Sequence, residues 1–288
     1  MTKKIWTVLL AAGATAVWTG PFSVAAQETE TLTEYTMETL HVASEETERS
    51  KETELLEETE FSEKAELSEE QRQEYVSAYR DALETFLQDQ MLPDKTTQWS
   101  LVEGMGEMEE NSFAISDVDS DGVPELVLHL VTAPMAGMLE GIYQYDPQTK
   151  ELKEELLGFP SAEYYEGGLL KMWWSHNQGL AGDSFWPYTI FEYDTESGTY
   201  EFTTNVDAWD KTLSETDYEG NTYPEDVDKE GAGIVYLITE KGEDDKNQET
   251  VMDKKTFEAW ELETFDPDRI LEIPYKAMTE EEIAAIQP

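Results

Sequence analysis

The composition of this chain changes at Ser68, and that change limits which part of it can fold. Residues 27–70 contain sixteen Glu, no Asp and only three basic residues, with no sustained apolar period. Like charges repel one another here, and so little apolar surface cannot offset the entropy lost on ordering a chain. We therefore expect residues 27–67 to form a disordered acidic tether and residues 68–288 to form a single folded domain.

The first 26 residues have the pattern of an export signal. Lys3 and Lys4 precede an apolar stretch, residues 5–18, which is shorter than the roughly 20 residues that a membrane-spanning helix needs. Small residues follow at 23–26, where cleavage is expected after Ala25 or after Ala26. The alternative is an anchor that stays uncleaved. The signal predicts a protein that is secreted, extracellular or associated with a cell wall, without membrane insertion after cleavage.

The charge of the chain excludes several classes of partner. Lys and Arg number 19 and Asp and Glu number 65, so the formal net charge is −46. Nucleic acid and anionic membranes would repel such a chain, whereas cations or a basic partner would be attracted. The chain has no Cys, which excludes disulfides, thiolate metal sites and Cys nucleophiles. Packing must therefore hold the fold, with the help of a metal ion if one binds.

The expected domain begins with an amphipathic helix. Ser68 and Gln71 fit a capping box, in which the side chain of each residue bonds to the backbone N–H of the other. Apolar residues then recur at spacings of three and four up to Leu87, which is the pattern of one buried helical face. Pro93 marks the end of this segment.

Short strands separated by turns follow the helix. They are expected at residues 112–116, 126–132, 141–146, 151–157, 169–175, 188–194, 199–204 and 234–239. The hairpins around turns 147–150 and 195–198 share one pattern, an aromatic residue and then Tyr-Asp before the turn, which indicates an antiparallel meander. A helix at 253–265, a last strand at 270–275 and a short helix capped by Thr279 complete the chain. The pattern predicts an α+β fold, an antiparallel β-meander sheet with an N-terminal helix and short C-terminal helices packed on it.

The segment 117–125, Asp-Val-Asp-Ser-Asp-Gly-Val-Pro-Glu, has the pattern of a calcium loop. Carboxylates at positions 1, 3 and 5 of a tight loop converge on one centre, and Gly122 permits the sharp turn. Ca²⁺ takes about six to eight oxygen ligands. The predicted ligands of a single Ca²⁺ are Asp117, Asp119, Asp121, the backbone carbonyl of Val123, and Glu125. The alternative is a solvated Asp/Gly turn.

The loop resembles the FG-GAP or integrin-type β-loop. An EF-hand would need a bidentate Glu at the twelfth position, where this chain has Leu128. A dockerin loop is a weaker match, because it leads into a helix. The chain also resembles a broad group of exported, uncharacterised proteins of Gram-positive bacteria, through residues 113–117, 121–126, 143–146, 273–275 and 279–283. The resemblance implies a secreted or wall-associated domain with a calcium loop, and it brings no known reaction from which a catalytic residue could be assigned.

Other parts of the sequence also offer candidate sites. Residues 226–231, Asp-Val-Asp-Lys-Glu-Gly, repeat part of the loop pattern and would form either a second metal site or an acidic turn. The aromatic segments 173–177 and 185–188 would bind a sugar or peptide if exposed, and would otherwise belong to the core. His176 lies beside Asp183 without the spacing of a nucleophile, so acid–base chemistry there has little support.

These patterns favour a secreted or cell-surface calcium-binding domain, non-catalytic and monomeric, which supports binding of an extracellular protein or glycan. One alternative is a secreted hydrolase with a structural calcium ion, and another is a structural surface domain. The chain has no HExxH, GxSxG, P-loop or dinucleotide fingerprint.

Overall fold

The computed structural model describes residues 67–242 and 246–287, which belong to one compact unit, Lys64–Pro288. The predicted signal peptide and the predicted tether lie outside the described residues, except for Leu67. Leu67 packs against the hydrophobic core that the following helix covers. Its carbonyl accepts a hydrogen bond from Arg72 Nε at 3.2 Å. No helix in the described part of the chain is long and apolar enough to cross a membrane.

The first helix, α2 (Glu69–Asp89), begins at the predicted capping box. The Ser68 Oγ accepts from Gln71 N at 3.3 Å, and Gln71 Oε1 accepts from Ser68 N at 2.9 Å. The buried face of the helix consists of Tyr75, Val76, Tyr79, Leu83 and Phe86. Gln90 ends the helix in the left-handed conformation, with φ of 54°, before the chain reaches Pro93.

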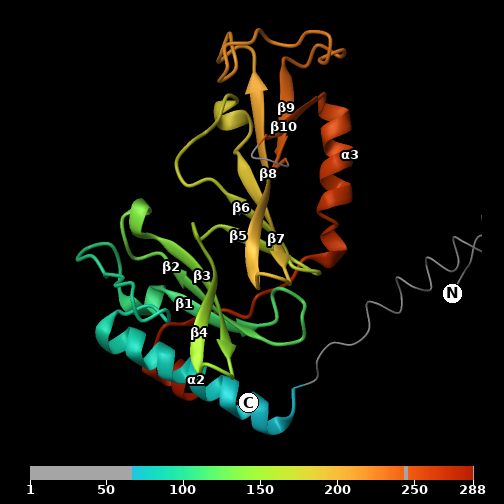
Figure 1. The fold of residues 1–288 in the computed structure, drawn as a ribbon. Helices are drawn as coiled ribbons and strands as arrows, with labels where there is room; N and C mark the ends of the chain where they lie inside the picture. The colour runs from blue at the N-terminus through green and yellow to red at the C-terminus, as the bar shows by residue number, and fades with distance from the viewer. Residues whose placement is uncertain (1–66, 243–245, 288) are drawn as a thin grey trace, which may run out of the picture. The chain divides into compact units, whose positions relative to one another are not determined.

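The strands form two antiparallel sheets, and α2 packs on the first of them (Figure 1). The first sheet has five strands in the order β11-β1-β2-β3-β4. Their bounds are β1 (Ser112–Ser116), β2 (Glu125–Leu130), β3 (Leu139–Asp146), β4 (Glu151–Gly158) and β11 (Lys276–Ala277). Side chains of Phe113, Leu126, Leu128 and Tyr143 meet the helix in one core. The short helix α4 (Glu280–Ala284) contributes Ile283 to the same core.

The second sheet has six strands in the sequential order β10-β9-β8-β7-β6-β5. Their bounds are β5 (Ala162–Tyr165), β6 (Leu169–Trp173), β7 (Tyr188–Asp194), β8 (Thr199–Asp210), β9 (Ile234–Glu240) and β10 (Gln248–Met252). Helix α3 (Lys254–Thr264) lies along this sheet (Figure 1), where the Phe257 ring stacks on Tyr236 with centroids 3.9 Å apart. The α+β prediction, with antiparallel strands and helices at both ends, is confirmed.

Some elements differ from the expected ones. The predicted strand at 270–275 does not form, and the chain pairs with β1 only at Lys276–Ala277. Pro274 has no N–H to give to a ladder, which limits pairing before it. Strands β5 and β10 were not predicted. The caps at Asp253 and Thr279 form as expected. Short 3₁₀ turns lie at η1 (Met108–Glu110), η2 (Met135–Gly137), η3 (Gly182–Ser184) and η5 (Pro267–Arg269).

The two sheets share a core of their own. Ala114, Val127, Ile142 and Leu156 of the first sheet pack with Tyr164, Leu170, Met172 and Tyr200 of the second. The acidic loop between β1 and β2 lies at this junction. Tyr200 donates from its hydroxyl to the Val118 carbonyl at 2.9 Å, and Gly167 N donates to Ser120 Oγ at 2.8 Å. The loop is therefore held by both sheets.

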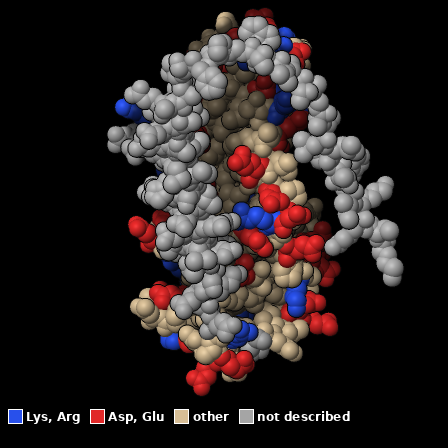
Figure 2. Space-filling view, turned by 90° about the vertical axis from the view of Figure 1, so that its right-hand side faces the viewer, with Lys and Arg blue, Asp and Glu red and all other residues tan. Residues whose placement is uncertain are grey.

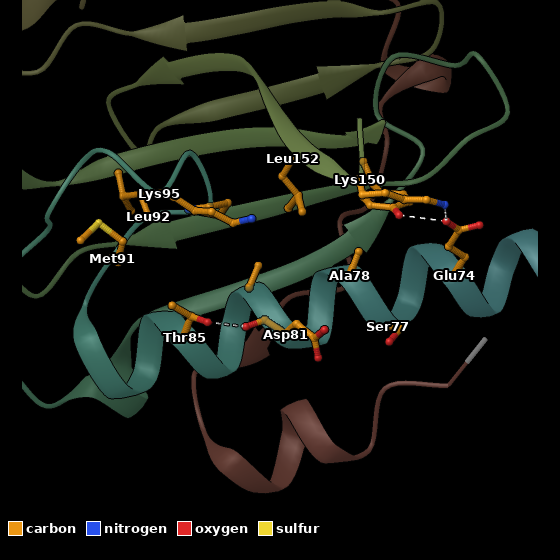
Figure 3. A pocket seen from close by; sticks show the side chains of 13 residues that line it. Glu74, Ser77, Ala78, Asp81, Thr85, Met91, Leu92, Lys95, Lys150 and Leu152 are labelled. Carbon is orange, nitrogen blue, oxygen red and sulfur yellow. Dashed lines mark hydrogen bonds and ion pairs between the residues drawn. The ribbon is translucent and has the colours of Figure 1, made fainter. Parts of the chain in front are cut away.

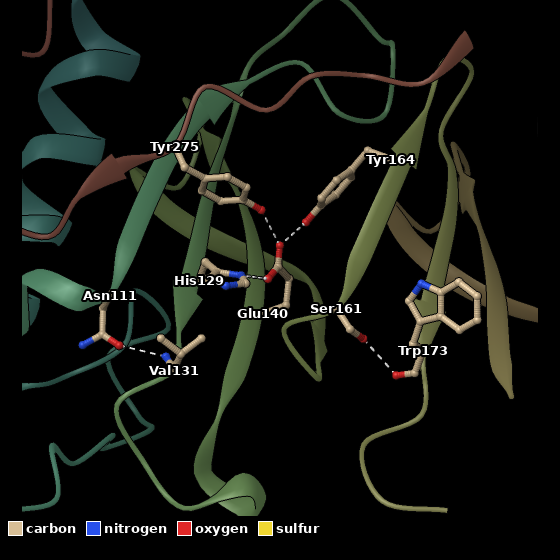
Figure 4. Close-up of polar contacts among 8 residues, drawn as sticks. All are labelled: Asn111, His129, Val131, Glu140, Ser161, Tyr164, Trp173 and Tyr275. Carbon is tan, nitrogen blue, oxygen red and sulfur yellow. Dashed lines mark hydrogen bonds and ion pairs between the residues drawn. The ribbon is translucent and has the colours of Figure 1, made fainter. Parts of the chain in front are cut away.

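A buried carboxylate, Glu140 on β3, also links the sheets (Figure 4). Its side chain is 1% exposed. The hydroxyls of Tyr164 and Tyr275 donate to it at 2.6 and 2.7 Å, and His129 Nδ1 lies 2.7 Å from its second oxygen. This carboxylate shows how the fold satisfies a buried acid through three polar partners.

Candidate metal centre

The acidic loop turns sharply between two paired strands. Ser116 on β1 pairs with Glu125 on β2, so the loop is closed at its base. Ser120 and Gly122 have φ of 69° and 92°, in the left-handed region. Glycine adopts this region at no steric cost, which explains Gly122. Ser120 is held there by the bond from Gly167 to its hydroxyl.

Three carboxylates of this loop come together. Asp117, Asp119 and Glu125 each offer one oxygen, and these three oxygens all lie within 4.8 Å of one another. Two ligands on opposite sides of a Ca²⁺ ion, each at about 2.3–2.6 Å from it, are about 5 Å apart. The group is therefore compact enough to hold one metal ion. Among the residues that the structure describes, it is the only group of at least three such side chains that meets this spacing.

Backbone N–H groups orient these carboxylates. Glu125 Oε2 accepts from Val118 N at 2.8 Å, so the ninth residue of the loop folds back over the second. Asp119 Oδ1 accepts from Asp121 N at 2.9 Å, and Asp117 Oδ2 accepts from Gly122 N at 3.2 Å. Each bond holds one carboxylate oxygen in place, and an ionised carboxylate has about four lone-pair sites in all.

The two other predicted ligands lie differently. Asp121 is exposed, and its carboxylate accepts from Val123 N at 2.6 Å and from Gln144 Nε2 at 3.2 Å. It is not one of the three grouped carboxylates, and it braces the turn and joins it to β3. Val123 packs its side chain against the core under α2.

Burial and mutual repulsion change the acidity of the site. Burial, together with the negative charges of Asp121 and Asp117, raises the pKa of Asp119 to about 7, although the bond from the Asp121 N–H acts to lower it. Burial and the negative charges of Asp119 and Glu155 raise the pKa of Glu125 well above its ordinary value. Asp119 is 5% exposed and Glu125 is 0% exposed. Ionised carboxylates in such surroundings need a compensating positive charge.

A further carboxylate, Glu155 on β4, belongs to the same environment and was not predicted from the sequence. Burial raises its pKa to about 8, and the carboxylates of Asp119 and Asp121 contribute to this. In the sequence, Glu155 is one of several acidic residues in the segment Glu151–Gly158. Nothing in that segment distinguishes it from the others. A pattern of loop spacing cannot identify a carboxylate that lies thirty residues beyond the loop.

The second acidic motif forms a braced turn. Asp228 accepts from Ala232 N and Gly233 N, each at 2.7 Å, and from the Tyr223 hydroxyl at 3.2 Å. Its two oxygens thus satisfy the backbone of the turn. The motif at 226–231 is not among the carboxylate groups that meet the metal spacing in the described chain.

Of the two aromatic segments, 173–177 lines a shallow groove of about 240 Å³ on the second sheet, and 185–188 does not. Its lining includes the rings of Trp173 and Trp174 together with His176 and Asn177. The indole of Trp174 donates to Thr189 Oγ1 at 3.0 Å, and that of Trp186, which is 36% exposed, donates to the Trp174 carbonyl at 2.6 Å. The tryptophans are therefore held rigidly, with part of their rings accessible.

A larger cleft of about 560 Å³ lies between α2 and the β3–β4 hairpin (Figure 3). Glu74 at one end pairs with Lys150 and accepts from the Tyr145 hydroxyl. The bonds from Lys150 and Tyr145 lower the pKa of Glu74. A general acid of a glycosidase needs a raised pKa, so Glu74 does not fit that role.

Comparison with protein-family models, with curated proteins and with solved structures found no match for this chain. The likeness of the loop to FG-GAP loops therefore stays a prediction. On the surface that Figure 2 presents, red acidic side chains outnumber blue basic ones. This agrees with the net charge of −46.

Proposed function

We propose that this protein is an exported, non-catalytic domain that binds one Ca²⁺ ion in the loop between β1 and β2. The observation that carries the proposal is the group formed by Asp117, Asp119 and Glu125. Without a cation, these buried carboxylates would either repel one another or stay protonated. A bound cation removes that conflict and holds the loop against the second sheet.

The chemistry of the site favours Ca²⁺ over Mg²⁺. Mg²⁺ is strictly octahedral and usually keeps several of its water molecules, whereas Ca²⁺ accepts irregular sets of carboxylate and carbonyl oxygens. Asp119 and Glu125 are almost fully buried, which leaves little room for waters between them and the ion. We expect an affinity of the order of 10⁻⁴ to 10⁻³ M, as in extracellular calcium modules.

Calorimetric titration of calcium into the chain from residue 27 onward tests the site. We expect one bound ion, and a loss of affinity of at least about tenfold in Asp119→Asn, because a ligand charge is lost. The matched control is Asp226→Asn, which makes the same change of charge in the second acidic motif and should keep the affinity of the unmodified protein. Equal affinities in all three proteins would remove the support for the assignment.

The groove beside Trp173 and Trp174 supports the second part of the proposal, binding of an extracellular ligand. Partly exposed aromatic rings beside amide and imidazole groups suit a carbohydrate, whose C–H faces stack on rings while its hydroxyls bond to polar side chains. The alternatives, a hydrolase and a purely structural domain, have no comparable observation in their favour. In the larger cleft, the bonds from Lys150 and Tyr145 lower the pKa of Glu74, whereas the general acid of a glycosidase needs a raised pKa.

A screen of soluble glycans and of cell-surface proteins, with and without chelator, tests this part. We expect a glycan to bind, and Trp174→Ala to weaken that binding by about tenfold or more, because aromatic anchors carry much of the energy of binding. Trp209→Phe, a change at a buried tryptophan outside the groove, serves as the control. Binding of proteins alone would redirect the proposal from a sugar to a protein partner.

A further inference from the structure

A β-bulge redirects one acidic residue of β4. In the pairing of β3 with β4, Ile142 lies opposite Leu156 and Tyr143 lies opposite Glu154, so Glu155 is the extra residue without a partner. Successive residues of a strand normally point to opposite faces, and a bulge interrupts this alternation and re-aims a side chain. As a result Glu155 and Leu156 are both buried, although they are neighbours in the strand.

The bulge lies level with the acidic loop. Gln144 on β3 lies between the loop and β4, because its amide donates to Asp121 Oδ2 at 3.2 Å and to Glu125 Oε1 at 3.3 Å, and its strand partner is Lys153. Two residues after Lys153, the chain reaches Glu155. Glu155 is close enough for its charge to act on Glu125, and for the charge of Asp119 to act on it. Glu155 is not one of the three carboxylates whose oxygens lie within 4.8 Å of one another, and its charge reaches that group from β4.

The carboxylate of Glu155 lacks the partners that a buried acid needs. Its side chain is 4% exposed, and neither oxygen accepts a hydrogen bond within the described residues. The Tyr193 hydroxyl lies nearby and acts to lower the pKa of Glu155, but it does not meet the geometry of a hydrogen bond to either oxygen. Glu140, which is equally buried, has three polar partners instead. A buried, ionised carboxylate without hydrogen-bond donors lowers the free energy of unfolding unless a cation takes the place of the donors.

We infer that Glu155 is a ligand of the cation bound by Asp117, Asp119 and Glu125, and that it reaches the ion from β4. The inference rests on the proposed function, since it needs a cation in the loop. The site is then not a linear loop motif. It joins the β1–β2 loop to the far strand of the same sheet, and it takes a divalent, oxygen-preferring cation such as Ca²⁺.

The test compares two adjacent substitutions on β4. Glu155→Gln keeps the shape of the side chain and removes its charge, and Glu154→Gln makes the same change at an exposed neighbour. We expect Glu155→Gln to weaken calcium binding by at least about tenfold, and Glu154→Gln to leave it within about twofold of the unmodified protein. Equal affinities in both variants, in a protein that does bind calcium, would overturn the inference and leave the proposed function standing. Absence of binding to the unmodified protein would instead overturn the proposed function.

A second measurement separates a ligand from a residue that only positions the loop. Terbium(III), which replaces Ca²⁺ in oxygen sites, reports the number of bound waters through its emission lifetimes in H₂O and D₂O. Glu155→Ala, which leaves no side-chain oxygen at this position, should add about one or two waters to the ion. If affinity falls in Glu155→Ala with no added water, Glu155 is not a ligand. Should Glu155→Gln fail to fold, Glu155→Asp, which keeps the charge and shortens the side chain, is expected to lower affinity and to add water in the same way. Unchanged affinity in Glu155→Asp would count against the inference.

Discussion

Calcium at about 10 mM is expected to raise the melting temperature of this protein by roughly 5–10 °C above its value in chelator. With a dissociation constant near 10⁻⁴ M, a hundredfold excess of ligand stabilises the folded state by about 2.7 kcal/mol. For a domain of this size, each kcal/mol shifts the melting temperature by roughly 2–4 °C. The physical cause is the replacement of repulsion among Asp117, Asp119 and Glu125 by attraction to a shared ion.

Thermal melts of the site variants show whether the rise comes from this loop. Glu125→Gln and Asp119→Asn should each lose most of the calcium-dependent rise, because each removes one of three grouped carboxylates. Asp226→Asn should keep it. The same variants should melt no lower than the unmodified protein in chelator, since they relieve repulsion. An unchanged melting temperature on addition of calcium would contradict the assignment of a metal site.

The stability of the metal-free protein is expected to fall as the pH rises from about 5 to about 8. Burial raises the folded-state pKa of Asp119 to about 7 and that of Glu155 to about 8. In the unfolded chain both groups titrate near pH 4. Between these values the folded state binds more protons than the unfolded state, so the free energy of unfolding falls with rising pH. The contribution is fully present below about pH 4 and is lost as the pH passes through 7 and 8.

The size of this effect is on the order of a few kcal/mol, because a shift of one pKa unit corresponds to about 1.4 kcal/mol and the coupled groups do not add fully. Melts at pH 5 and pH 8 in chelator should therefore differ by roughly 5–10 °C, with the higher value at pH 5. Calcium binds the ionised carboxylates, so its stabilisation should grow over the same range and offset the fall. Surface acids with lowered pKa, such as Asp146 and Asp194, titrate below this window.

A substitution isolates the cause of the pH dependence. Glu155→Gln should flatten the slope between pH 5 and pH 8 in chelator, and Glu154→Gln should leave more of it. If the metal-free protein is equally stable at pH 5 and pH 8, these carboxylates are not buried in the way the structure shows.

Local features of this fold were predictable from the sequence because nearby residues decide them. Ser68, Asp253 and Thr279 cap helices through bonds to N–H groups three residues away. The turns at 147–150 and 195–198 form hairpins, because each turn is short and the strands on its two sides pair with each other. The spacing of the loop likewise predicts that Asp117, Asp119 and Glu125 are metal ligands and that Gly122 permits the turn.

Only the tertiary structure decided how these pieces meet. The strands divide into two sheets, and the pattern of strands along the sequence does not predict this division. A connection that crosses from one sheet to the other has the same sequence pattern as a hairpin turn within one sheet. The loop's third aspartate, Asp121, bonds to Gln144 on β3 and lies outside the carboxylate group. Glu155 turns inward because a bulge shifts the β3–β4 register by one residue. Spacing along the chain determines which residues can share a turn, but register between distant strands determines which carboxylates can share an ion.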